Sequence, residues 1–584
     1  MTAPSLRVFR TKGRYFPYAR NCIIRASPPD RLSRNLFLHS RMKTPSVLRS
    51  ARRTTSQQRT SDTPPAQPSP RLPPPHPSHP MRSFKSDVLL NVGLTFVSLL
   101  GTMWLLWLAS RALDPAALGL FLLIRRLADT VSQLMHLGAP IAIRRYLTVS
   151  SQAHDRAGHF FAALVLAIVG IGVWATVLLA FPRTAMKLLG ETEGSDPQTM
   201  ICTVLLSGAL VFHYLANSSL LSRRRVVAAN VLELTNVAAI PIAVLYLTDS
   251  ITPQHLITIQ AVGVTALSFA VLTAIVFSAR GAVDSPTRPL SFEYLRETAT
   301  YGLPRAVSLI LESGFLVIGP WLLRDDLAAV AYLTIAFFLL RLARIAAQPV
   351  AILIGMKLGA LHSLGQRNDV RRGLDLITGG ALLSAAIIVP VVHCWSALIL
   401  QLWVGDSLAA SVQPYVNVLL LAIAPLALLQ TLKEPIEIMW KSPYILGAFT
   451  LGNALLLAIG ALLRPAAGAS DAVTWAYVIA YFAMCTCALA VVRKYLSDLW
   501  QFGLFRLAGL ATLSYVVNAI AVHATESSSI WWRVAGMVSV GSLSAAVVVA
   551  GYLWASPSPV AATLRDYLME GFLSLHRRLV STSR

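Results

Sequence analysis

Long apolar runs recur along the chain from Val88 to Trp554, and only short polar connections separate them. A helix needs about 20 apolar residues to cross the roughly 30 Å hydrocarbon core of a bilayer. Backbone groups at that depth must be hydrogen-bonded within their own element, which favours helices over open strands or loops. The pattern therefore predicts fourteen membrane-spanning helices. They are expected near residues 88–110, 117–140, 159–181, 200–221, 226–248, 254–278, 299–323, 328–352, 376–402, 412–438, 443–463, 472–492, 503–524 and 530–554.

The composition agrees with this pattern. Hydrophobic residues make up 55% of the chain, charged residues make up 13%, and the mean hydropathy is +0.60. A water-soluble surface needs more charge than this. The expected fold class is therefore an all-α polytopic membrane protein. The five cysteines show no CxxC or Cys/His ligand spacing, so no metal site is expected.

The net charge of +23 is concentrated in the first part of the chain. Residues 1–80 hold fifteen Lys and Arg and two acids, a net +13, which leaves +10 for the other 504 residues. This segment is rich in Pro, Ser and Arg and has too little apolar surface to offset the entropy of ordering. Three interpretations are open: a disordered tail, an organelle transit peptide, or a misplaced start with Met81 as the first residue.

Charge also alternates between successive connections. Those after spans two, four and six carry arginine clusters such as Arg223–Arg225, whereas those after spans one, three and seven carry mostly acids, such as Asp325 and Asp326. Lys and Arg concentrate in cytoplasmic connections. We therefore expect a bacterial inner-membrane protein with both termini in the cytoplasm. The same rule explains the basic charge without nucleic-acid binding.

The two halves of the chain resemble each other. Span two follows an acidic turn at Asp114 and contains Pro140, and span eight follows Asp326 and contains Pro349. We interpret spans 1–6 and 7–12 as two pseudo-symmetric six-helix lobes, related by an axis along the membrane normal as in parallel-repeat transporters. Chance similarity of apolar sequence is the alternative. The expected organisation is a tail (1–80), an N-terminal lobe (81–280), a C-terminal lobe (281–495), two extra helices (496–555) and a basic cytoplasmic tail (556–584).

Four stretches carry a family resemblance. Residues 118–146 run from Gly-Leu-Phe through a long apolar helix to Leu-Gly and a basic exit ending in Arg-Tyr. Tyr301-Gly-Leu-Pro304 opens span seven, the helix from Ala331 to Pro349 follows it, and Leu402-Trp-Val-Gly405 precedes span ten. These loose motifs, within about residues 81–500, resemble the Wzx-type polysaccharide and O-antigen flippases of the MOP superfamily, relatives of MATE exporters and lipid II flippases. The resemblance implies a central cavity that opens alternately to either side. It also implies an undecaprenyl-pyrophosphate-linked oligosaccharide as substrate and, as further partners, membrane lipids and the glycan polymerase or export machinery.

Polar residues recur at three- and four-residue steps within the spans, which places them on one helix face. A charge at mid-bilayer costs at least about 2.5–3.5 kcal/mol, so these side chains are expected to face a cavity or a partner. The set comprises Arg126, Asp129, Gln133 and His136 in span two, Arg305, Ser308 and Glu312 in span seven, Arg341, Arg344 and Gln348 in span eight, and Asn91 in span one.

Guanidinium groups present planar donors that match phosphate oxygens. We therefore expect the four arginines of this set to bind the lipid pyrophosphate. Asp129 and Glu312 are candidates for proton or sodium coupling, and the neutral residues are expected to line the cavity. The alternative is that Arg126–Asp129 and Arg305–Glu312 are internal salt bridges that hold helices together.

Absent motifs narrow the function further. The sequence contains no GxxxxGK[ST] phosphate loop, no HExxH and no GxSxG. No cofactor and no enzymatic activity are expected. The expected function is flipping of a lipid-linked oligosaccharide by alternating access. Its competitors are a cation-coupled multidrug exporter, which would need an acidic cavity; an enzyme of cell-envelope glycan assembly, which the short outer connections disfavour; and a pore or scaffold subunit.

Overall fold

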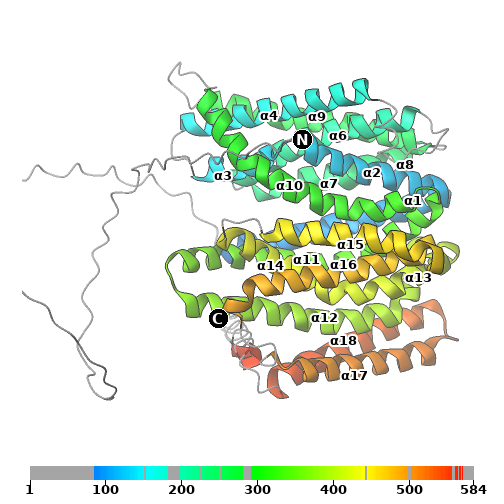
Figure 1. Ribbon diagram of the computed structural model, residues 1–584. Helices are drawn as coiled ribbons and strands as arrows, with labels where there is room; N and C mark the ends of the chain where they lie inside the picture. Colours follow the sequence, from blue (N-terminus) through cyan, green and yellow to red (C-terminus); the bar gives the residue numbers. More distant parts are fainter. Residues whose placement is uncertain are drawn as a thin grey trace, which may run out of the picture. The chain divides into compact units, whose positions relative to one another are not determined.

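The computed structural model describes residues 84–149, 153–181, 197–223, 225–248, 251–280, 291–440, 444–496 and 502–555, with short pieces of 560–569. Within these ranges, the side chains of 84–92, 95, 148–149, 153, 178–179, 278–280, 341–354, 356–357, 360, 363, 465–467 and 555 are not described. Every regular element in these ranges is helical (Figure 1). The elements are α1 (Phe84–Ala112), α2 (Pro115–Met135), α3 (Ala139–Val149), α4 (Ala153–Ala180), α6 (Pro197–Ser222), α7 (Val226–Leu234), η1 (Thr235–Ala239), α8 (Ile240–Leu247), α9 (Pro253–Arg280), α10 (Phe292–Leu322), α11 (Leu327–Ser363), α12 (Arg367–Val404), α13 (Asp406–Leu419), η2 (Leu420–Ala422), α14 (Ile423–Met439), α15 (Tyr444–Ala467), α16 (Ala469–Val492), η3 (Arg493–Tyr495), α17 (Leu504–Thr525) and α18 (Ile530–Ala555).

Apolar helices account for the fourteen predicted spans. Eleven helical segments in the described residues are long and apolar enough to cross a membrane. α1, the α2–α3 pair and α11 supply the other three, with shorter apolar stretches at Phe96–Ala112 and Leu327–Leu340. The predicted fold class is therefore confirmed. The predicted tail, residues 1–80, lies outside the described residues, and so does the chain just after the predicted lobe boundary at 280.

Helix packing repeats between the two halves. In the first half, α2 packs on α4 and α6, α6 packs on α9, and α1 packs on α7. In the second half, α11 packs on α12 and α14, α14 packs on α16, and α10 packs on α15. Each pair in the second half lies six spans after its counterpart. The internal repeat read from the sequence thus has a counterpart in the order of packing.

The first turns of α2 and α11 are built alike. Asp114 Oδ1 accepts hydrogen bonds from the backbone N–H groups of Ala116 and Ala117, at 2.9 and 3.0 Å. Asp326 Oδ1 accepts one from Ala329 at 3.0 Å. Aspartate at this position satisfies N–H groups that have no partner within the helix. The acids that mark the repeat in the sequence therefore start the two corresponding helices.

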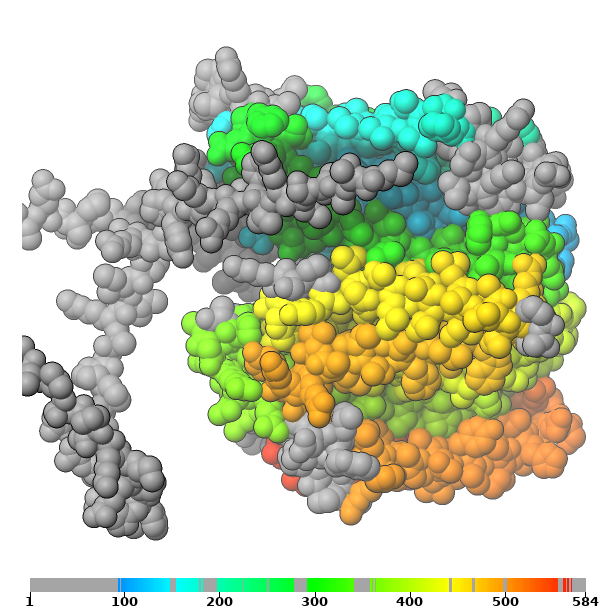
Figure 2. Space-filling model, in the orientation of Figure 1, coloured from blue at the N-terminus to red at the C-terminus, as the bar shows by residue number. Residues whose placement is uncertain are grey.

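The lobes meet along α2, which packs on α10 and α11 as well as on α6. A Cβ at Gly119 of α2 would lie 1.8 Å from the carbonyl oxygen of Leu327, the first residue of α11, so the two backbones touch here. Trp403 of α12 donates from Nε1 to the carbonyl oxygen of Met103 in α1, at 2.8 Å. Figure 2 shows α10, in green, against α15, in yellow. Gly119 and Trp403 therefore lie where the two lobes contact each other, near the starts of α2 and α11. We call this end of the bundle, which contains Asp114 and Asp326, the acidic end.

The two extra helices attach to the C-terminal lobe. α17 and α18 pack on each other and on α12 (Figure 1). At the centre of this contact, Asn518 of α17 accepts a hydrogen bond from Trp395 Nε1 and donates one to Ser544 Oγ of α18, both at 2.9 Å. One buried amide therefore links three helices.

Asn518→Ala is expected to weaken this attachment. It removes two interhelical hydrogen bonds, and such bonds in membrane proteins contribute on average about 0.6 kcal/mol and at most about 1.7 kcal/mol each. We expect the free energy of unfolding in detergent to fall by about 1–2 kcal/mol. Ser539→Ala is the control, because Ser539 Oγ bonds only to its own helix in the described residues. Equal stability of the two variants would contradict the prediction.

Candidate functional site

The second span is interrupted between α2 and α3. The backbone passes through Leu137 (φ 50°) and Gly138 (φ 76°). A left-handed φ is open to glycine and unusual for leucine. A Cβ at Gly138 would lie 2.1 Å from the carbonyl oxygen of Gly302 in α10, so the two chains also approach closely here. The continuous helix predicted for 117–140 is corrected to two helices joined by a tight break.

His136 and Gln133, both predicted to line a cavity, lie at this break. The backbone N–H of Gly138 donates to His136 Nδ1 at 3.1 Å, and His136 Nε2 lies 2.8 Å from Gln133 Oε1. Because Nδ1 accepts a hydrogen bond, the ring proton lies on Nε2 and is donated to Gln133. The His136 side chain is 1% exposed. It therefore stabilises the break and does not face open water.

Charged residues of α2 face different neighbours. Arg125 donates from Nη2 to the carbonyl oxygen of Val237 in η1, at 3.0 Å. Arg126 lies within electrostatic range of Tyr477 on α16. Asp129 Oδ1 accepts a hydrogen bond of 2.5 Å from the Tyr214 hydroxyl of α6. α2 thus ties the N-terminal lobe together through Arg125 and Asp129 and presents Arg126 toward the other lobe.

A polar network fills the interior of the N-terminal lobe. His213 Nε2 of α6 lies 2.7 Å from Glu233 Oε2 of α7, which also accepts a hydrogen bond from Asn217 Nδ2 at 3.0 Å. His213 Nδ1 lies 2.5 Å from Asn236 Nδ2. Gln260 Nε2 of α9 donates to the carbonyl oxygen of Asn236 at 3.1 Å. Side chains of α7 and η1 therefore contact one histidine of α6, and α9 joins the network through the backbone of η1.

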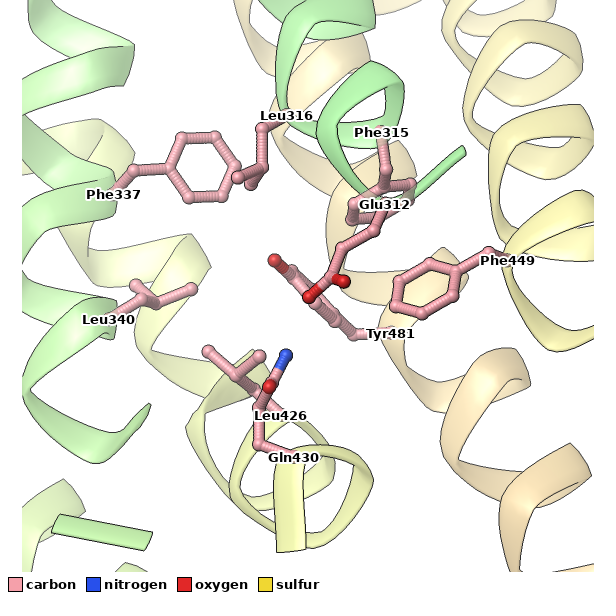
Figure 3. Close-up of a pocket in the computed structure, with 9 residues that line it drawn as sticks. All are labelled: Glu312, Phe315, Leu316, Phe337, Leu340, Leu426, Gln430, Phe449 and Tyr481. Carbon is pink, nitrogen blue, oxygen red and sulfur yellow. The ribbon is translucent and has the colours of Figure 1, made fainter. Parts of the chain in front are cut away.

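A charged pair lies in the interior of the C-terminal lobe. Lys433 of α14 pairs with the carboxylate of Glu312 in α10, and the two side chains are only 12% and 14% exposed. Glu312 borders a cavity shared by α10, α11, α14, α15 and α16, in which its carboxylate, Gln430 and Tyr481 point toward one another (Figure 3). The cavity offers about 30 Å³ to the centres of water molecules, enough for one or two waters.

Arginines gather at the opposite end of the bundle, where α3 ends and α10 begins, which we call the basic end. The guanidinium carbons of Arg145 and Arg305 lie 4.6 and 3.9 Å from the ring centroid of Tyr301. Arg144 interacts electrostatically with Glu434 and Glu437 of α14. Charges from α3, α10 and α14, and so from both lobes, meet at this end.

An aromatic cluster fixes the first turns of α10 to α3 and α4. The rings of Tyr146 and His159 stack with centroids 3.9 Å apart. His159 Nδ1 lies 3.1 Å from Thr298 Oγ1, and the Tyr294 hydroxyl donates to Asp155 Oδ1 at 2.8 Å. Arg305 is thereby held beside the arginines of α3.

The predicted site residues fall into several groups. The side chains of Arg341, Arg344, Gln348 and Asn91 lie outside the described residues. Arg126 and Asp129 face different neighbours, and Ser308 is partly exposed on α10. Arg305 donates from Nη1 to its own helix at the Tyr301 carbonyl, 3.3 Å away. The partner shown for Glu312 is Lys433, which corrects the proposed Arg305–Glu312 bridge.

Sequence reasoning missed most of the His213 network. The structure pairs Glu233 of α7 with His213 of α6. Spacing offered a partial signal. His213 and Asn217 are four residues apart, and Glu233 and Asn236 are three apart, so each pair shares a helix face. Nothing in a single sequence says that these two faces oppose each other.

Comparison with known proteins identifies the fold. No family model matches the chain, and no curated protein matches it. A solved structure of the lipid II flippase MurJ in an inward closed conformation matches with a TM-score of 0.63 and 13% identity, covering 79% of this chain and 98% of that one. An inward-facing multidrug resistance MATE family transporter of the MOP superfamily matches with a TM-score of 0.53 and 13% identity, covering 70% and 97%. This chain therefore has the multi-pass membrane fold of the MurJ and MATE transporters.

Proposed function

We propose that this protein is a membrane transporter, and not an enzyme, that flips an undecaprenyl-pyrophosphate-linked oligosaccharide across the bacterial inner membrane by alternating access, for surface polysaccharide biosynthesis. Both termini are cytoplasmic in this proposal, so the basic end faces the cytoplasm, in keeping with the positive-inside rule. The observation that carries the proposal is the meeting of Arg144, Arg145 and Arg305 where the lobes come together.

These arginines suit a pyrophosphate. Guanidinium groups bind phosphate oxygens with paired, charge-assisted hydrogen bonds. Arg144 and Arg145 are exposed at the basic end, where a ligand arrives from solution or from the bilayer surface in this proposal. Glu434 and Glu437 lie within electrostatic range of Arg144 and offset its charge. An incoming pyrophosphate would displace these carboxylates and loosen the contact between the lobes.

Arg126 would act at the next stage. It lies on α2 among elements of both lobes, in range of Tyr477. The predicted partners Arg341 and Arg344 are on α11, which packs directly on α2. In this scheme the pyrophosphate passes from the basic end to these arginines, while the lipid tail remains in the bilayer.

The competing transporter function is cation-coupled drug export, which the likeness to a MATE structure keeps open. A drug cation needs carboxylates that are not already neutralised. Glu312, the acid that borders the interior cavity of the C-terminal lobe, is paired with Lys433. This pairing favours the anionic substrate.

Purified protein in proteoliposomes tests the proposal. A fluorescent undecaprenyl-pyrophosphate oligosaccharide is added, and its arrival in the opposite leaflet is measured by accessibility to an impermeant reagent. We expect Arg305→Ala and Arg126→Ala each to lower the translocation rate by at least roughly tenfold, equivalent to about 1.4 kcal/mol. Arg305→Lys should restore only part of the rate, because lysine lacks the bidentate geometry.

Arg464→Ala is the matched control. Arg464 is half exposed and pairs with Asp325, both near the acidic end. It should translocate at the wild-type rate. Wild-type rates in correctly inserted Arg126→Ala and Arg305→Ala would overturn the role of these arginines. Export of cationic dyes without glycan translocation would instead support the drug exporter.

A further inference from the structure

An apolar groove lies between α1 and α12 at the acidic end of the bundle. It has a volume of about 300 Å³ and is lined by Met103, Trp104, Trp107, Leu402 and Trp403. Trp104 and Leu402 are 52% and 41% exposed, so the groove is open to the surface. Because α1 belongs to the N-terminal lobe and α12 to the C-terminal lobe, the groove crosses the boundary between the lobes.

Aromatic side chains fix the walls of this groove. Trp403 is 7% exposed and donates from Nε1 to the Met103 carbonyl oxygen at 2.8 Å, so its ring is anchored across the lobe boundary. Trp104 meets the ring of Tyr246 in α8 edge-on, with centroids 6.4 Å apart. Tryptophan and tyrosine concentrate at the level where lipid headgroups meet acyl chains. The groove therefore lies where the acyl chains of one leaflet meet their headgroups.

The face of α1 that forms the groove changes from apolar to charged toward the acidic end. Met103, Trp107 and Arg111 follow one another at four-residue steps, so they lie on one helix face. The helix rises roughly 12 Å from the first of them to the last. The Arg111 guanidinium carbon lies 3.9 Å from the centroid of the Trp107 ring. A lipid chain that lies along Met103 and Trp107 would place its headgroup phosphate beside Arg111.

Arg111 supplies a positive charge for that headgroup. Its side chain is exposed, and among the described residues no salt bridge joins it to an acid. Asp114, the acid nearest to it in sequence, accepts hydrogen bonds from the backbone of α2. Guanidinium groups bind phosphate oxygens with charge-assisted hydrogen bonds. A headgroup with a net negative charge would neutralise Arg111, whereas a zwitterionic headgroup brings a cation of its own, so the groove favours an anionic phospholipid.

We propose that this groove binds an anionic phospholipid of the bilayer, with an acyl chain against Trp107 and Trp403 and the headgroup phosphate on Arg111, and that the bound lipid holds α1 and α12 together. The walls come from both lobes, so the groove exists only while the acidic end is closed. A ligand that binds one of two arrangements shifts the population toward it. Binding and closure stand on the groove alone, and an effect of the lipid on glycan translocation rests on the proposed function.

Lipid binding is tested in nanodiscs, without transport. Protein labelled with 5-fluorotryptophan is placed in phosphatidylcholine, which phosphatidylglycerol replaces stepwise. The Trp107 ¹⁹F signal is identified by its absence in Trp107→Phe. We expect this signal to shift and to saturate as phosphatidylglycerol rises. Arg111→Gln should need about fivefold more phosphatidylglycerol for the same shift, because one arginine loses its contact with an anionic headgroup.

Arg464→Gln is the matched control for Arg111→Gln. Arg464 is an exposed arginine near the same end of the bundle, but it is already paired with Asp325. This variant should give the wild-type curve. The proposal is overturned if the Trp107 signal stays fixed, if Arg111→Gln also gives the wild-type curve, or if exposed Trp531 of α18 follows the same curve as Trp107. A Trp107 signal that moves only when lipid-linked glycan is added would assign the groove to the substrate and would also overturn it.

Closure is tested with spin labels at Ala116 of α2 and Ala328 of α11 on a cysteine-free background. We expect the share of short distances between the labels to rise with phosphatidylglycerol, over the range in which the Trp107 signal shifts. In Arg111→Gln it should not rise over that range. Distances that stay unchanged while the Trp107 signal saturates would overturn the closure step. Neither measurement needs transport, so a failure to translocate glycan would overturn the proposed function and leave the lipid site standing.

Discussion

Lys433→Met is expected to destabilise the C-terminal lobe by about 3 kcal/mol. Removing one member of a buried ion pair leaves the other charge in a low-dielectric interior, which typically costs about 3–5 kcal/mol. Lys433 and Glu312 are 12% and 14% exposed, and the cavity beside Glu312 has room for only one or two waters, so little solvent can compensate. The free energy of unfolding in mixed micelles, measured by denaturant titration, should show this loss.

The double variant Glu312→Gln/Lys433→Met separates charge from packing. Without either charge, the interior contains only neutral groups, and neutral replacements of buried pairs are often tolerated. We expect this variant to regain most of the lost stability. A single variant within about 0.5 kcal/mol of wild type would show that other groups already balance Glu312. The earlier expectation that Glu312 couples transport to an ion remains a prediction, and Lys433 is the group an ion would have to replace.

Gly119→Ala should hold the acidic end open and lower translocation by at least roughly tenfold. The added methyl group would lie 1.8 Å from the Leu327 carbonyl oxygen, so the backbones of α2 and α11 cannot keep their present approach. Spin labels at Ala116 and Ala328 on a cysteine-free background should report a longer distance between the two helices.

Gly208→Ala provides the comparison for Gly119. Gly208 is also within a spanning helix, but a Cβ there meets nothing within 4 Å. It should keep both the wild-type distance and the wild-type rate. If Gly119→Ala behaves in the same way as Gly208→Ala, close contact at the acidic end is not needed for transport.

Much of the fold could be predicted because it depends on local chemistry. Runs of about 20 apolar residues mark spanning helices, and Asp114 and Asp326 mark the starts of α2 and α11. The break at Leu137 was not predictable in the same way. Its left-handed backbone follows from a close approach to Gly302, far away in the sequence.

The site was predicted less well, because helical spacing shows which residues share a helix face but not which helix lies opposite that face. The spacing of Arg126, Asp129 and His136 predicts that their side chains lie on one helix face. In the structure His136 stabilises a break and Asp129 binds Tyr214. Lys433 lies in the interior of the lobe and pairs with Glu312 of another helix. Such pairings require knowing which helices are adjacent.

The attachment of α17 and α18 has a practical consequence. The pair is fastened chiefly to α12, and its central bonds run through Asn518 and Trp395. When the two lobes move relative to each other, α17 and α18 therefore move with the C-terminal lobe. A fluorescent protein or antibody epitope fused beyond α18 would therefore serve as a fiducial for that half alone, leaving the crevice between the halves unobstructed.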